Sequence, residues 1–443
     1  MISSTTRPLT DRTAMSNPSP RPSTADRLLP ARAGSSLVDH HGRLGPLPHR
    51  AAVELVRMVD GAGLLGRGGA GFPTARKVAA VAEAVAKTRL PAVVVANCCE
   101  GDPTSAKDAV LIDRSPHLVI DGAVAAAAAV GADRIVLAVH GGSPAHRTLR
   151  FALSERPSSE ADIELVAIPA RYLASEATAL VRFLNTGDAR PAGRLPIWEK
   201  GVDGRPTLVD NAETLAQLAL IARFGPNWFA TVGSPGEPGT TLITIGGAVP
   251  HPGVLEVPTG TAIRDVLART GSQCTGWALI GGLAGRWVNL DGAAGIGFST
   301  AELTGIGAGR GVGSITVLPP GACVLMETVR IVAHQAQAGA RQCGPCMFGL
   351  PAIAADLAAL AAGDRGALTR LRRRLPIIDG RGACGHPDGT VALAASALGS
   401  ITSHEPGHLE RHLGGHGCRP SSVVPLPAVS TVVPTGAQNG WWS

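Results

Sequence analysis

Short runs of β-branched residues alternate with Ala-rich helical stretches through the first half of the chain, and this alternation constrains the fold more than any other feature. The runs 92–96, 134–139 and 163–168 have the length and composition of strands, and the stretches 118–130 and 145–155 have those of helices. Such an alternation predicts a layered α/β domain with a mainly parallel sheet. Ligands bind beyond the carboxyl ends of the strands in sheets of this kind.

Two further regions follow the α/β pattern. Past Pro226, Gly/Pro turns separate short strands, with one helical segment at 262–268, which is typical of a small β-rich domain. From 327 to 413, Leu, Ala and Ile recur at three- and four-residue spacing, as they do in packed helices. The predicted organisation is a disordered tail at 1–45, an α/β domain at 46–234, a β-rich domain at 235–320, a helical domain at 321–420 and a disordered tail at 421–443.

The charge and composition exclude several classes of protein. The net charge of +6 is concentrated at the amino end, where residues 1–50 hold seven Arg and three Asp, so the folded part is nearly neutral. With 3% aromatic residues, no nucleic-acid partner is expected. Eight cysteines are too few for a disulfide scaffold and include a Cys-x-x-Cys, which indicates a reducing compartment. No apolar segment is long enough for a membrane span, so we expect a cytoplasmic protein, either free or at the periphery of a membrane complex.

The first chemical motif is a glycine-rich loop at 66–74, Gly-Arg-Gly-Gly-Ala-Gly-Phe-Pro-Thr, followed by Lys77. Its glycines let backbone N–H groups approach a phosphate or a flat ring closely, while Arg67 and Lys77 supply positive charge. This pattern predicts phosphate or dinucleotide binding, with a flexible surface turn as the alternative. The loop lies between helices rather than after a strand, so it is not the usual Rossmann fingerprint.

A second motif follows the predicted strand 92–96, at the end where α/β sheets expose functional side chains. It is the turn Asn97-Cys98-Cys99-Glu100-Gly101-Asp102-Pro103, with Lys107 shortly after. An amide, two thiols and two acids at a strand end can contact a polar ligand. Alone, the motif is more typical of a polar turn, but together with the glycine-rich loop it indicates a ligand site.

Four motifs in a fixed order carry a family resemblance. They are the loop 66–74 with Lys77, the turn 97–103 with Lys107, the segment 171–180 that contains Tyr172 and Glu176, and the segment 206–215, Pro-Thr-Leu-Val-Asp-Asn-Ala-Glu-Thr-Leu. In these motifs the chain resembles the NADH-binding flavoprotein subunit (F subunit) of NADH-quinone oxidoreductase, which is also found in soluble hydrogenases and formate dehydrogenases. The likeness covers roughly residues 50–420.

The resemblance implies a Rossmann-like α/β domain that binds FMN and NAD(H), a soluble-ligand-binding β-grasp (SLBB) domain, and a C-terminal helical bundle with a 4Fe-4S cluster. It implies an NADH dehydrogenase that takes hydride from NADH onto FMN and passes single electrons through the cluster to a thioredoxin-like 2Fe-2S subunit, a ferredoxin-type acceptor or a quinone-reducing complex. Since the cofactors carry the chemistry, no catalytic side chain is expected. The residues implied in cofactor binding are Gly66, Arg67, Gly68, Gly69, Ala70, Gly71, Phe72, Lys77, Asn97, Cys99, Glu100, Asp102, Tyr172, Glu176, Val209, Asp210 and Asn211.

The expected cluster site departs from the family pattern. Cys343, Cys346 and Cys384 match three of the ligands, but Ala340 stands where the first cysteine belongs. Because each iron of a cubane needs an outer ligand, three thiolates leave a cluster with a non-Cys or exchangeable ligand, a three-iron form, or no cluster. Substitute ligands could come from four residues: His334, His386, Cys323 and Cys418. A tetrahedral zinc site that uses His386 and inert core thiols are the competing interpretations.

A histidine series lies near the carboxyl end. It consists of His404, His408, His412 and His416, at four-residue intervals. Such spacing aligns side chains on one face of a helix, but the Pro-Gly pair at 406–407 and the Gly-Gly pair at 414–415 interrupt it. We therefore expect a solvated helix end rather than a set of metal ligands.

Substitutions inside the motifs leave parts of the function open. Ala177 replaces a Glu that, in relatives, contacts the ribose of NADH and repels the phosphate of NADPH, so the choice of nucleotide stays open. Cys99 stands where the family has Asp beside the flavin. Asp102 stands where the family has Glu, so its side chain is one carbon shorter. These changes suggest a divergent paralogue in a soluble redox chain. The alternatives are a non-catalytic ligand-binding adaptor and a zinc-bound structural protein that keep the fold.

Overall fold

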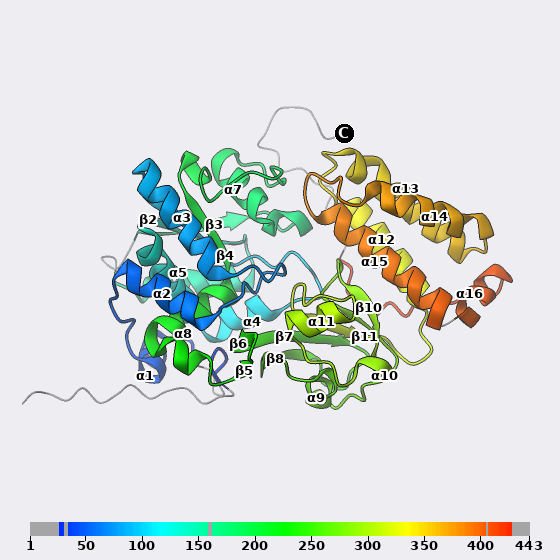
Figure 1. The fold of residues 1–443 in the computed structure, drawn as a ribbon, viewed down its shortest axis with the longest axis horizontal. Helices are drawn as coiled ribbons and strands as arrows, with labels where there is room; N and C mark the ends of the chain where they lie inside the picture. The colour runs from blue at the N-terminus through cyan, green and yellow to red at the C-terminus, as the bar shows by residue number, and fades with distance from the viewer. Residues whose placement is uncertain (1–25, 31–33, 158–161, 405, 428–443) are drawn as a thin grey trace, which may run out of the picture.

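The computed structural model describes residues 26–30, 34–157, 162–404 and 406–427, which form three packed parts (Figure 1). An α/β domain with a parallel sheet, a mixed sheet with short helices, and a helical region follow one another along the chain. In Figure 1 the α/β domain and the carboxyl-terminal helices lie at opposite ends, with the mixed sheet below and between them. The predicted order of an α/β, a β-rich and a helical region is confirmed.

The α/β domain is built on a four-stranded parallel sheet with the order β3-β2-β1-β4. Its strands are β1 (Ala92–Asn97), β2 (Ala132–His140), β3 (Ile163–Ile168) and β4 (Thr207–Asn211). Its helices are α2 (Ala52–Ala62), α3 (Thr74–Thr88), α4 (Lys107–Arg114), α5 (Pro116–Val130), α6 (Pro144–Ser154), η1 (Tyr172–Ser175), α7 (Ala177–Thr186), η2 (Val202–Gly204) and α8 (Ala212–Phe229). The strand β1 is central and almost wholly buried, which explains its unbroken apolar sequence.

The Ala-rich helix α5 packs closely against α8. At Gly122 of α5, a Cβ atom would lie 1.9 Å from the carbonyl oxygen of Leu215, so only glycine allows this approach. Thirteen of the fifteen residues of α5 and the first eleven residues of α8 are buried, and their apolar side chains form one core with the sheet. Since α8 begins directly after β4, this packing fixes the direction in which the end of β4 points.

The segment before residue 46 is partly ordered, so the predicted disordered tail at 1–45 is wrong for its described residues. Helix α1 spans Leu37–Leu44. The buried guanidinium of Arg27 donates to the Phe229 carbonyl at 2.9 Å and lies over the Trp228 ring. The Leu28 amide donates to Glu256 at 2.9 Å. These contacts join the segment to residues some two hundred positions away, and composition alone carries no signal of them; residues 1–25 lie outside the described part.

The second part contains a five-stranded mixed sheet with the order β10-β9-β11-β7-β8. Its pairs are antiparallel except β11 with β7. The elements are β5 (Gly233–Ser234), β6 (Glu237–Pro238), β7 (Thr240–Gly247), β8 (Gly253–Pro258), α9 (Ile263–Ala268), β9 (Trp277–Ile280), β10 (Arg286–Asn289), α10 (Leu290–Ala293), α11 (Thr300–Gly305) and β11 (Ser314–Val317). The predicted helix is α9; α10 and α11 were not predicted, and their four and six residues are too few to show a helical period clearly.

The third part is a helical region whose apolar core also includes Trp277, Leu279, Leu283 and Trp287 of the mixed-sheet part. Its elements are α12 (Val324–Ala338), a π-helical turn η3 (Pro345–Gly349), α13 (Leu350–Ala361), α14 (Arg365–Ile378), α15 (His386–Gly399), a second π-helical turn η4 (Ser400–His404) and α16 (Pro406–Leu413). The chain beyond α16 is also packed, since Val424 is buried and the Ser421 hydroxyl donates to Glu327 at 2.7 Å. The predicted tail at 421–443 is therefore wrong for 421–427, and residues 428–443 lie outside the described part.

Polar contacts join the three parts. Asp102 of the α/β domain accepts from the Leu283 amide at 2.8 Å, and the Gln335 amide of α12 donates to the Leu283 carbonyl at 2.8 Å. Gln342 donates to the Pro191 carbonyl at 2.9 Å, which brings the cysteine-bearing segment to the α/β domain. Across the described ranges, no helix is long and apolar enough to cross a membrane.

Candidate active site

The polar ends of two neighbouring parallel strands meet at one edge of the α/β sheet. In the pairing of β1 with β4, Asn97 lies beside Asn211, and Ala96 beside Asp210. The chain continues from β1 to β2 on one side, whereas β4 lies on the other side, so this edge is a point where the strand order reverses. Ligands of open α/β sheets bind at such a point, beyond the carboxyl ends of the strands.

The glycine-rich loop lies over this edge. The Gly66 amide donates to the Phe72 carbonyl at 2.8 Å, which closes the loop before α3 begins. A Cβ atom at Gly68 would face the Asn211 side chain at 3.9 Å, with no closer neighbour from the described residues. Gly68, Ala70 and Phe72 are exposed, so the loop presents an open surface above the end of β4.

Lys77 connects the helix after the loop to the end of β4. Its ammonium donates to the Val209 carbonyl at 2.9 Å and to Asp210 Oδ1 at 2.5 Å. The other carboxylate oxygen, Asp210 Oδ2, is buried and has no hydrogen-bond partner among the described residues, and the same holds for Thr74 Oγ1, one helical turn before Lys77. Buried polar atoms are seldom left unpaired. Thr74 begins α3 directly after the loop and Asp210 lies near the end of β4, so both unpaired atoms belong to elements that border the open loop.

The amide and carboxylate of the second motif hold the surrounding backbone. Asn97 donates to the Ser175 carbonyl at 2.8 Å and accepts from the Cys99 amide. The carboxylate of Glu100 accepts from the amides of Asp108 and Ala109 at the start of α4. These side chains give the strand end its shape, and both remain partly exposed.

The side chains of Cys99 and Asp102 are buried and contact other parts of the chain. The Cys99 thiol is buried against the Ala138 carbonyl, and burial raises its pKa to about 12. Burial also raises the pKa of Asp102, whose carboxylate is held by Thr104 and by the Leu283 amide of the mixed sheet. Asp102 therefore acts as a contact between domains, and the thiol is kept protonated and unreactive.

The expectation that the Arg67 side chain supplies charge to a phosphate is wrong. The guanidinium is buried and forms an ion pair with Glu237 at 2.6 Å, to which Arg310 also donates at 2.6 Å. The Arg67 amide donates to Thr214 Oγ1, so this residue fixes the loop from below. A charge already paired with a buried carboxylate is not available to a ligand.

A buried charge cluster beneath the site was not predicted as such. The Lys107 ammonium lies 2.7 Å from Asp108 and 3.0 Å from Glu213. Burial lowers the pKa of Lys107, but the two carboxylates outweigh this effect and keep it above its usual value. Burial raises the pKa of Asp108 to about 6. Lysine is rare in this chain and Lys107 lies in one of the four motifs, and these two features were the sequence signal that could have pointed to the cluster.

Tyr172 and Glu176 lie at the boundary with the helical region. The Tyr172 ring is 5.5 Å from that of His386, between ring centroids, in an edge-on arrangement. Burial raises the pKa of the Tyr172 phenol far above its usual range. The Glu176 carboxylate accepts from the Ala179 amide at the start of α7. The two residues therefore place the segment 171–180 beside the cysteine-bearing segment.

The three predicted cluster cysteines come together at this boundary. Cys346 lies in the π-helical turn η3, Cys343 lies two residues before this turn, and Cys384 lies in the loop before α15. Burial raises the pKa of Cys384 to about 11, and the nearby Glu176, Cys346 and Cys343 contribute. The Arg341 amide donates to the Cys346 sulfur at 3.2 Å, a contact that also stabilises cluster thiolates. Three thiols and an amide donor fit one side of an iron–sulfur cluster.

The segment that contains Ala340 lies against Cys346. A Cβ atom built on the neighbouring Gly339 would lie 2.6 Å from the Cys346 sulfur and 3.5 Å from His386 Nε2. His386 Nε2 pairs with the Gln335 carbonyl at 2.9 Å, while its Nδ1 atom is buried without a hydrogen-bond partner among the described residues. Of the four substitutes considered, His386 is thus placed next to the cysteines.

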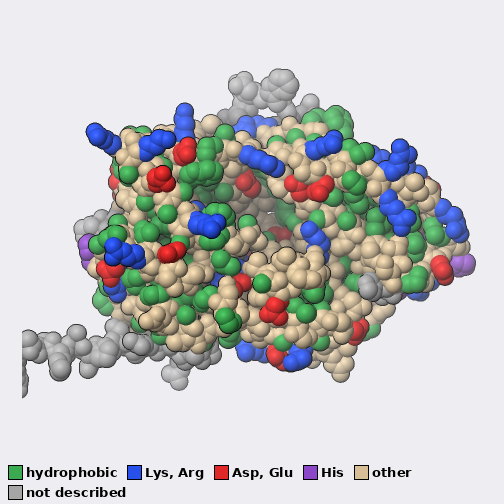
Figure 2. All heavy atoms as spheres, viewed as in Figure 1, with side chains coloured by type: hydrophobic (Ala, Val, Ile, Leu, Met, Phe, Trp, Pro, Cys, Tyr) green, Lys and Arg blue, Asp and Glu red, His purple; other side chains and the backbone are tan. Residues whose placement is uncertain are grey.

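An arginine-lined hollow borders the same turn. A cavity of about 560 Å³ is lined by four arginines of the helical region and by apolar residues around η3, namely Gly344, Pro345, Phe348, Gly349, Arg370, Arg373, Arg374, Ile377, Ile378 and Arg381. Arg370 and Arg374 are paired with Asp356, whereas Arg373 and Arg381 have no carboxylate partner in the described ranges. Figure 2 shows a second hollow between the α/β domain and the helical region, bordered by acidic side chains.

Comparison with known proteins gives two family matches. Residues 59–220 match the Nuo51 FMN-binding domain, and residues 326–403 match the NADH-ubiquinone oxidoreductase-F iron–sulfur binding region. The F subunit of the Mycobacterium tuberculosis NADH-quinone oxidoreductase is 30% identical over 400 residues, which cover 82% of this chain and 86% of the relative. The HndC subunit of the NADP-reducing hydrogenase of Solidesulfovibrio fructosivorans is 28% identical, with 75% of this chain and 71% of the relative covered.

A solved structure has the same arrangement. The NAD⁺-reducing [NiFe]-hydrogenase in the H₂-reduced state matches with a TM-score of 0.73 and 26% identity. The match covers 89% of this chain and 67% of the hydrogenase chain. The likeness therefore extends over all three parts of the fold.

Proposed function

Because this chain belongs to the family of NADH-quinone oxidoreductase F subunits, we propose that it is an FMN-dependent NAD(P)H dehydrogenase that delivers single electrons through an iron–sulfur cluster to a protein acceptor. The observation that carries the proposal is the open glycine loop above the end of β4, where Asp210 Oδ2 and Thr74 Oγ1 are buried and unpaired. A flat cofactor fits the open surface of this loop.

In this proposal, the residues of the chain bind the cofactors and orient them. FMN, when bound, accepts a hydride from the nicotinamide and releases electrons singly. Hydride transfer needs the two reacting atoms at about 3–3.5 Å, so the geometry of the binding loop decides the rate. The loop 66–72 would give backbone donors and a flat surface, and Lys77 holds Val209 and Asp210 in place below it. Cys343, Cys346 and Cys384 would hold the cluster at the domain boundary.

An absorption spectrum tests this function directly. We expect anaerobically purified protein to show a flavin band that bleaches on addition of NADH or NADPH. Colourless, flavin-free protein that stays unchanged with either nucleotide would contradict the proposal and favour a non-catalytic adaptor.

The nucleotide preference is set by the start of α7. Ala177 is the first residue of this helix, beside the capping carboxylate of Glu176, and it is partly exposed. Ala177→Glu is expected to improve NADH selectivity about tenfold or more, since a hydrogen bond to a charged group contributes about 1.5–3 kcal/mol and the carboxylate repels the 2′-phosphate of NADPH. The ratio of kcat/KM for the two nucleotides measures this effect.

The matched control is Ala177→Gln, which offers hydrogen bonds without the charge. It is expected to change the ratio less than the glutamate variant does. Equal NADPH rates in wild type and Ala177→Glu would show that position 177 does not face the ribose.

The protein acceptor is proposed to dock at the arginine-lined hollow beside η3. Its unpaired Arg373 and Arg381, with the exposed Phe348 and Ile377, favour an acidic partner with an apolar patch. The proposed partner is an electron acceptor, either a thioredoxin-like 2Fe-2S protein or a ferredoxin-type carrier. The short distance from this hollow to Cys343 and Cys346 in the sequence and the fold supports the choice.

Charge reversal tests the docking surface. Arg373→Glu is expected to lower kcat/KM for reduction of an acidic 2Fe-2S protein about tenfold at low salt, with a smaller effect at high salt, because steering by charge is screened. Arg372→Glu, an exposed neighbour outside the hollow, is the control. An equal loss in both variants, or a loss with a small neutral acceptor, would count against docking here.

Two finer assignments belong to the proposal. The mixed sheet with α9 packed on it, through Ile263, Val266 and Leu267, supports a soluble-ligand-binding β-grasp (SLBB) domain. A cytoplasmic location, free or at the periphery of a membrane complex, is supported by eight cysteines that are all free thiols.

A further inference from the structure

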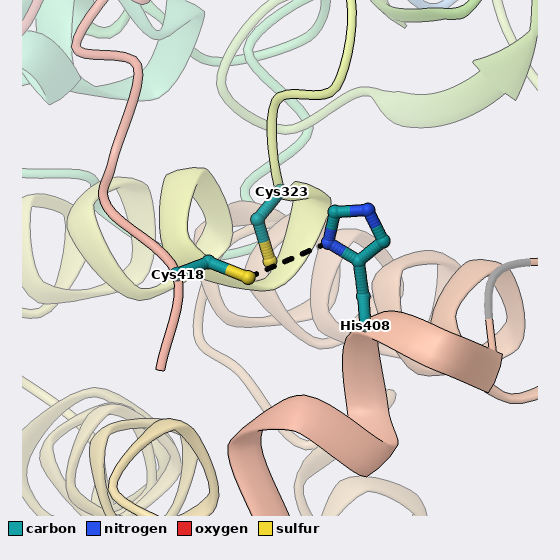
Figure 3. A group of neighbouring side chains, drawn as sticks. All are labelled: Cys323, His408 and Cys418. Atoms are coloured by element: carbon teal, nitrogen blue, oxygen red, sulfur yellow. Dashed lines mark hydrogen bonds between the residues drawn. The ribbon is translucent and has the colours of Figure 1, made fainter. Parts of the chain in front are cut away.

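Two cysteines and a histidine from distant segments meet at the outer end of the helical region. The ligand atoms of Cys323, His408 and Cys418 all lie within 4.8 Å of one another (Figure 3). Cys418 Sγ is 3.5 Å from His408 Nδ1. Cys323 immediately precedes α12, His408 lies on α16, and Cys418 lies on the segment after α16. The three side chains point toward one another in Figure 3.

A second histidine of α16 reaches the group at Cys323, although its ligand atom does not lie within 4.8 Å of all three others. His412 is buried, and its Nε2 atom lies 3.4 Å from Cys323 Sγ. Its Nδ1 atom is 2.7 Å from the Ala361 carbonyl, which can only accept, so Nδ1 carries the proton and Nε2 keeps its lone pair toward the sulfur. A carbonyl on the far ring nitrogen is the usual support of a metal-bound histidine. His408 and His412 are four residues apart on one helix, which places both on the same face.

We propose that Cys323, Cys418, His408 and His412 form a structural Zn²⁺ site that is separate from the iron–sulfur cluster. Two thiolates and two imidazoles are a donor set that zinc takes in closed tetrahedral sites. The site uses no substrate and stands outside the proposed redox function.

The two groups of thiols have different neighbours. Burial raises the pKa of Cys323 to about 11, and Cys418 contributes to this rise. The charges that act on the pKa of Cys384 come from Glu176, Cys346 and Cys343 instead. Cys323 and Cys418 are therefore placed with each other rather than as replacements for the missing cluster ligand. A thiol that is protonated in the free protein becomes a thiolate when it binds a cation.

The site would fasten the end of the chain to the helix that leads to the cluster. Past Cys418, the Ser421 hydroxyl and the Ser422 amide both pair with Glu327 of α12, at 2.7 Å and 2.6 Å. A metal bound by Cys323 before α12, by the two histidines of α16 and by Cys418 after it would hold α16 and the following segment against α12. The expectation that the histidine series is only a solvated helix end is wrong for His412, which is buried; the side chain of His404 lies outside the described part.

Metal analysis of the full chain tests the site. Zinc, iron and sulfide are measured per chain in wild type, Cys418→Ser and His408→Gln, with Cys274→Ser, a cysteine of the mixed-sheet domain, as the control. We expect about one zinc in wild type and in the control, and loss of that zinc in the other two variants, with iron unchanged in all four. Chelated wild-type protein titrated with Co²⁺ is expected to show thiolate-to-metal and tetrahedral d–d absorption, and this measurement needs no variant to fold.

Three outcomes would overturn the proposal. Wild-type protein with neither zinc nor Co²⁺–thiolate absorption would show that the group is a set of paired thiols and imidazoles only. Zinc retained in both Cys418→Ser and His408→Gln would place the metal elsewhere. Iron lost from Cys418→Ser would make Cys418 a cluster ligand. Since none of these results depends on flavin or nucleotide, failure here is distinguishable from failure of the proposed function.

Discussion

Gly68→Val is expected to remove bound flavin while the protein stays folded. The backbone at Gly68 does not adopt a left-handed conformation, and an added Cβ meets only the Asn211 side chain, at 3.9 Å. A valine is therefore compatible with the chain itself. It would occupy the open surface of the loop on which the flat ring of a cofactor must lie. Because a displacement of about 1 Å can cost about a hundredfold in rate, we expect NADH oxidation to fall by at least that factor.

The measurement is flavin released per chain, together with NADH-dependent reduction of a small acceptor and thermal unfolding of the flavin-free protein. Gly236→Val is the matched control, since Gly236 lies in an exposed turn with no atom within 4 Å of an added Cβ. The unfolding temperature without flavin should be nearly equal in both variants and wild type. Flavin content unchanged in Gly68→Val would mean that the ring binds away from this loop.

The sequence predicted the strand that carries the site better than it predicted which strands and side chains contact one another there. The apolar run 92–96 corresponds to β1, and the placement of Asn97 at its end follows from the buried central strand. The pairing of β1 with β4 joins residues more than a hundred positions apart, and the sequence did not predict it.

Charged residues were the least predictable. Arg67 and Lys77 are both basic residues of one motif, yet Arg67 is buried against Glu237, 170 positions away, and Lys77 stays at the site. Nothing local in the sequence separates them, because the difference lies in a carboxylate of another domain. The prediction from the histidine series was wrong for His412 for the same reason. The partner of His412 is Cys323, and only the fold brings α16 to the start of α12.

Ala340→Cys is expected to make the cluster resistant to loss of iron. The segment 339–341 already lies against Cys346, whose sulfur accepts from the Arg341 amide at 3.2 Å, so a sulfur at position 340 would join the other three thiols. Three thiolates leave one iron with an exchangeable or non-cysteine ligand, and a fourth closes that position. After exposure to air, we expect the variant to keep iron and sulfide about ten times longer than wild type does.

Iron, sulfide and the decay of the cluster absorption are measured over time for wild type, Ala340→Cys and a control, Ala362→Cys, which adds an exposed thiol at the end of α13. The control should decay as wild type does, because its sulfur is placed away from Cys343 and Cys384. A wild-type cluster as durable as that of Ala340→Cys would mean that another group already fills the fourth position. His386, whose buried Nδ1 has no hydrogen-bond partner in the described ranges, is then the residue whose replacement should destroy the cluster.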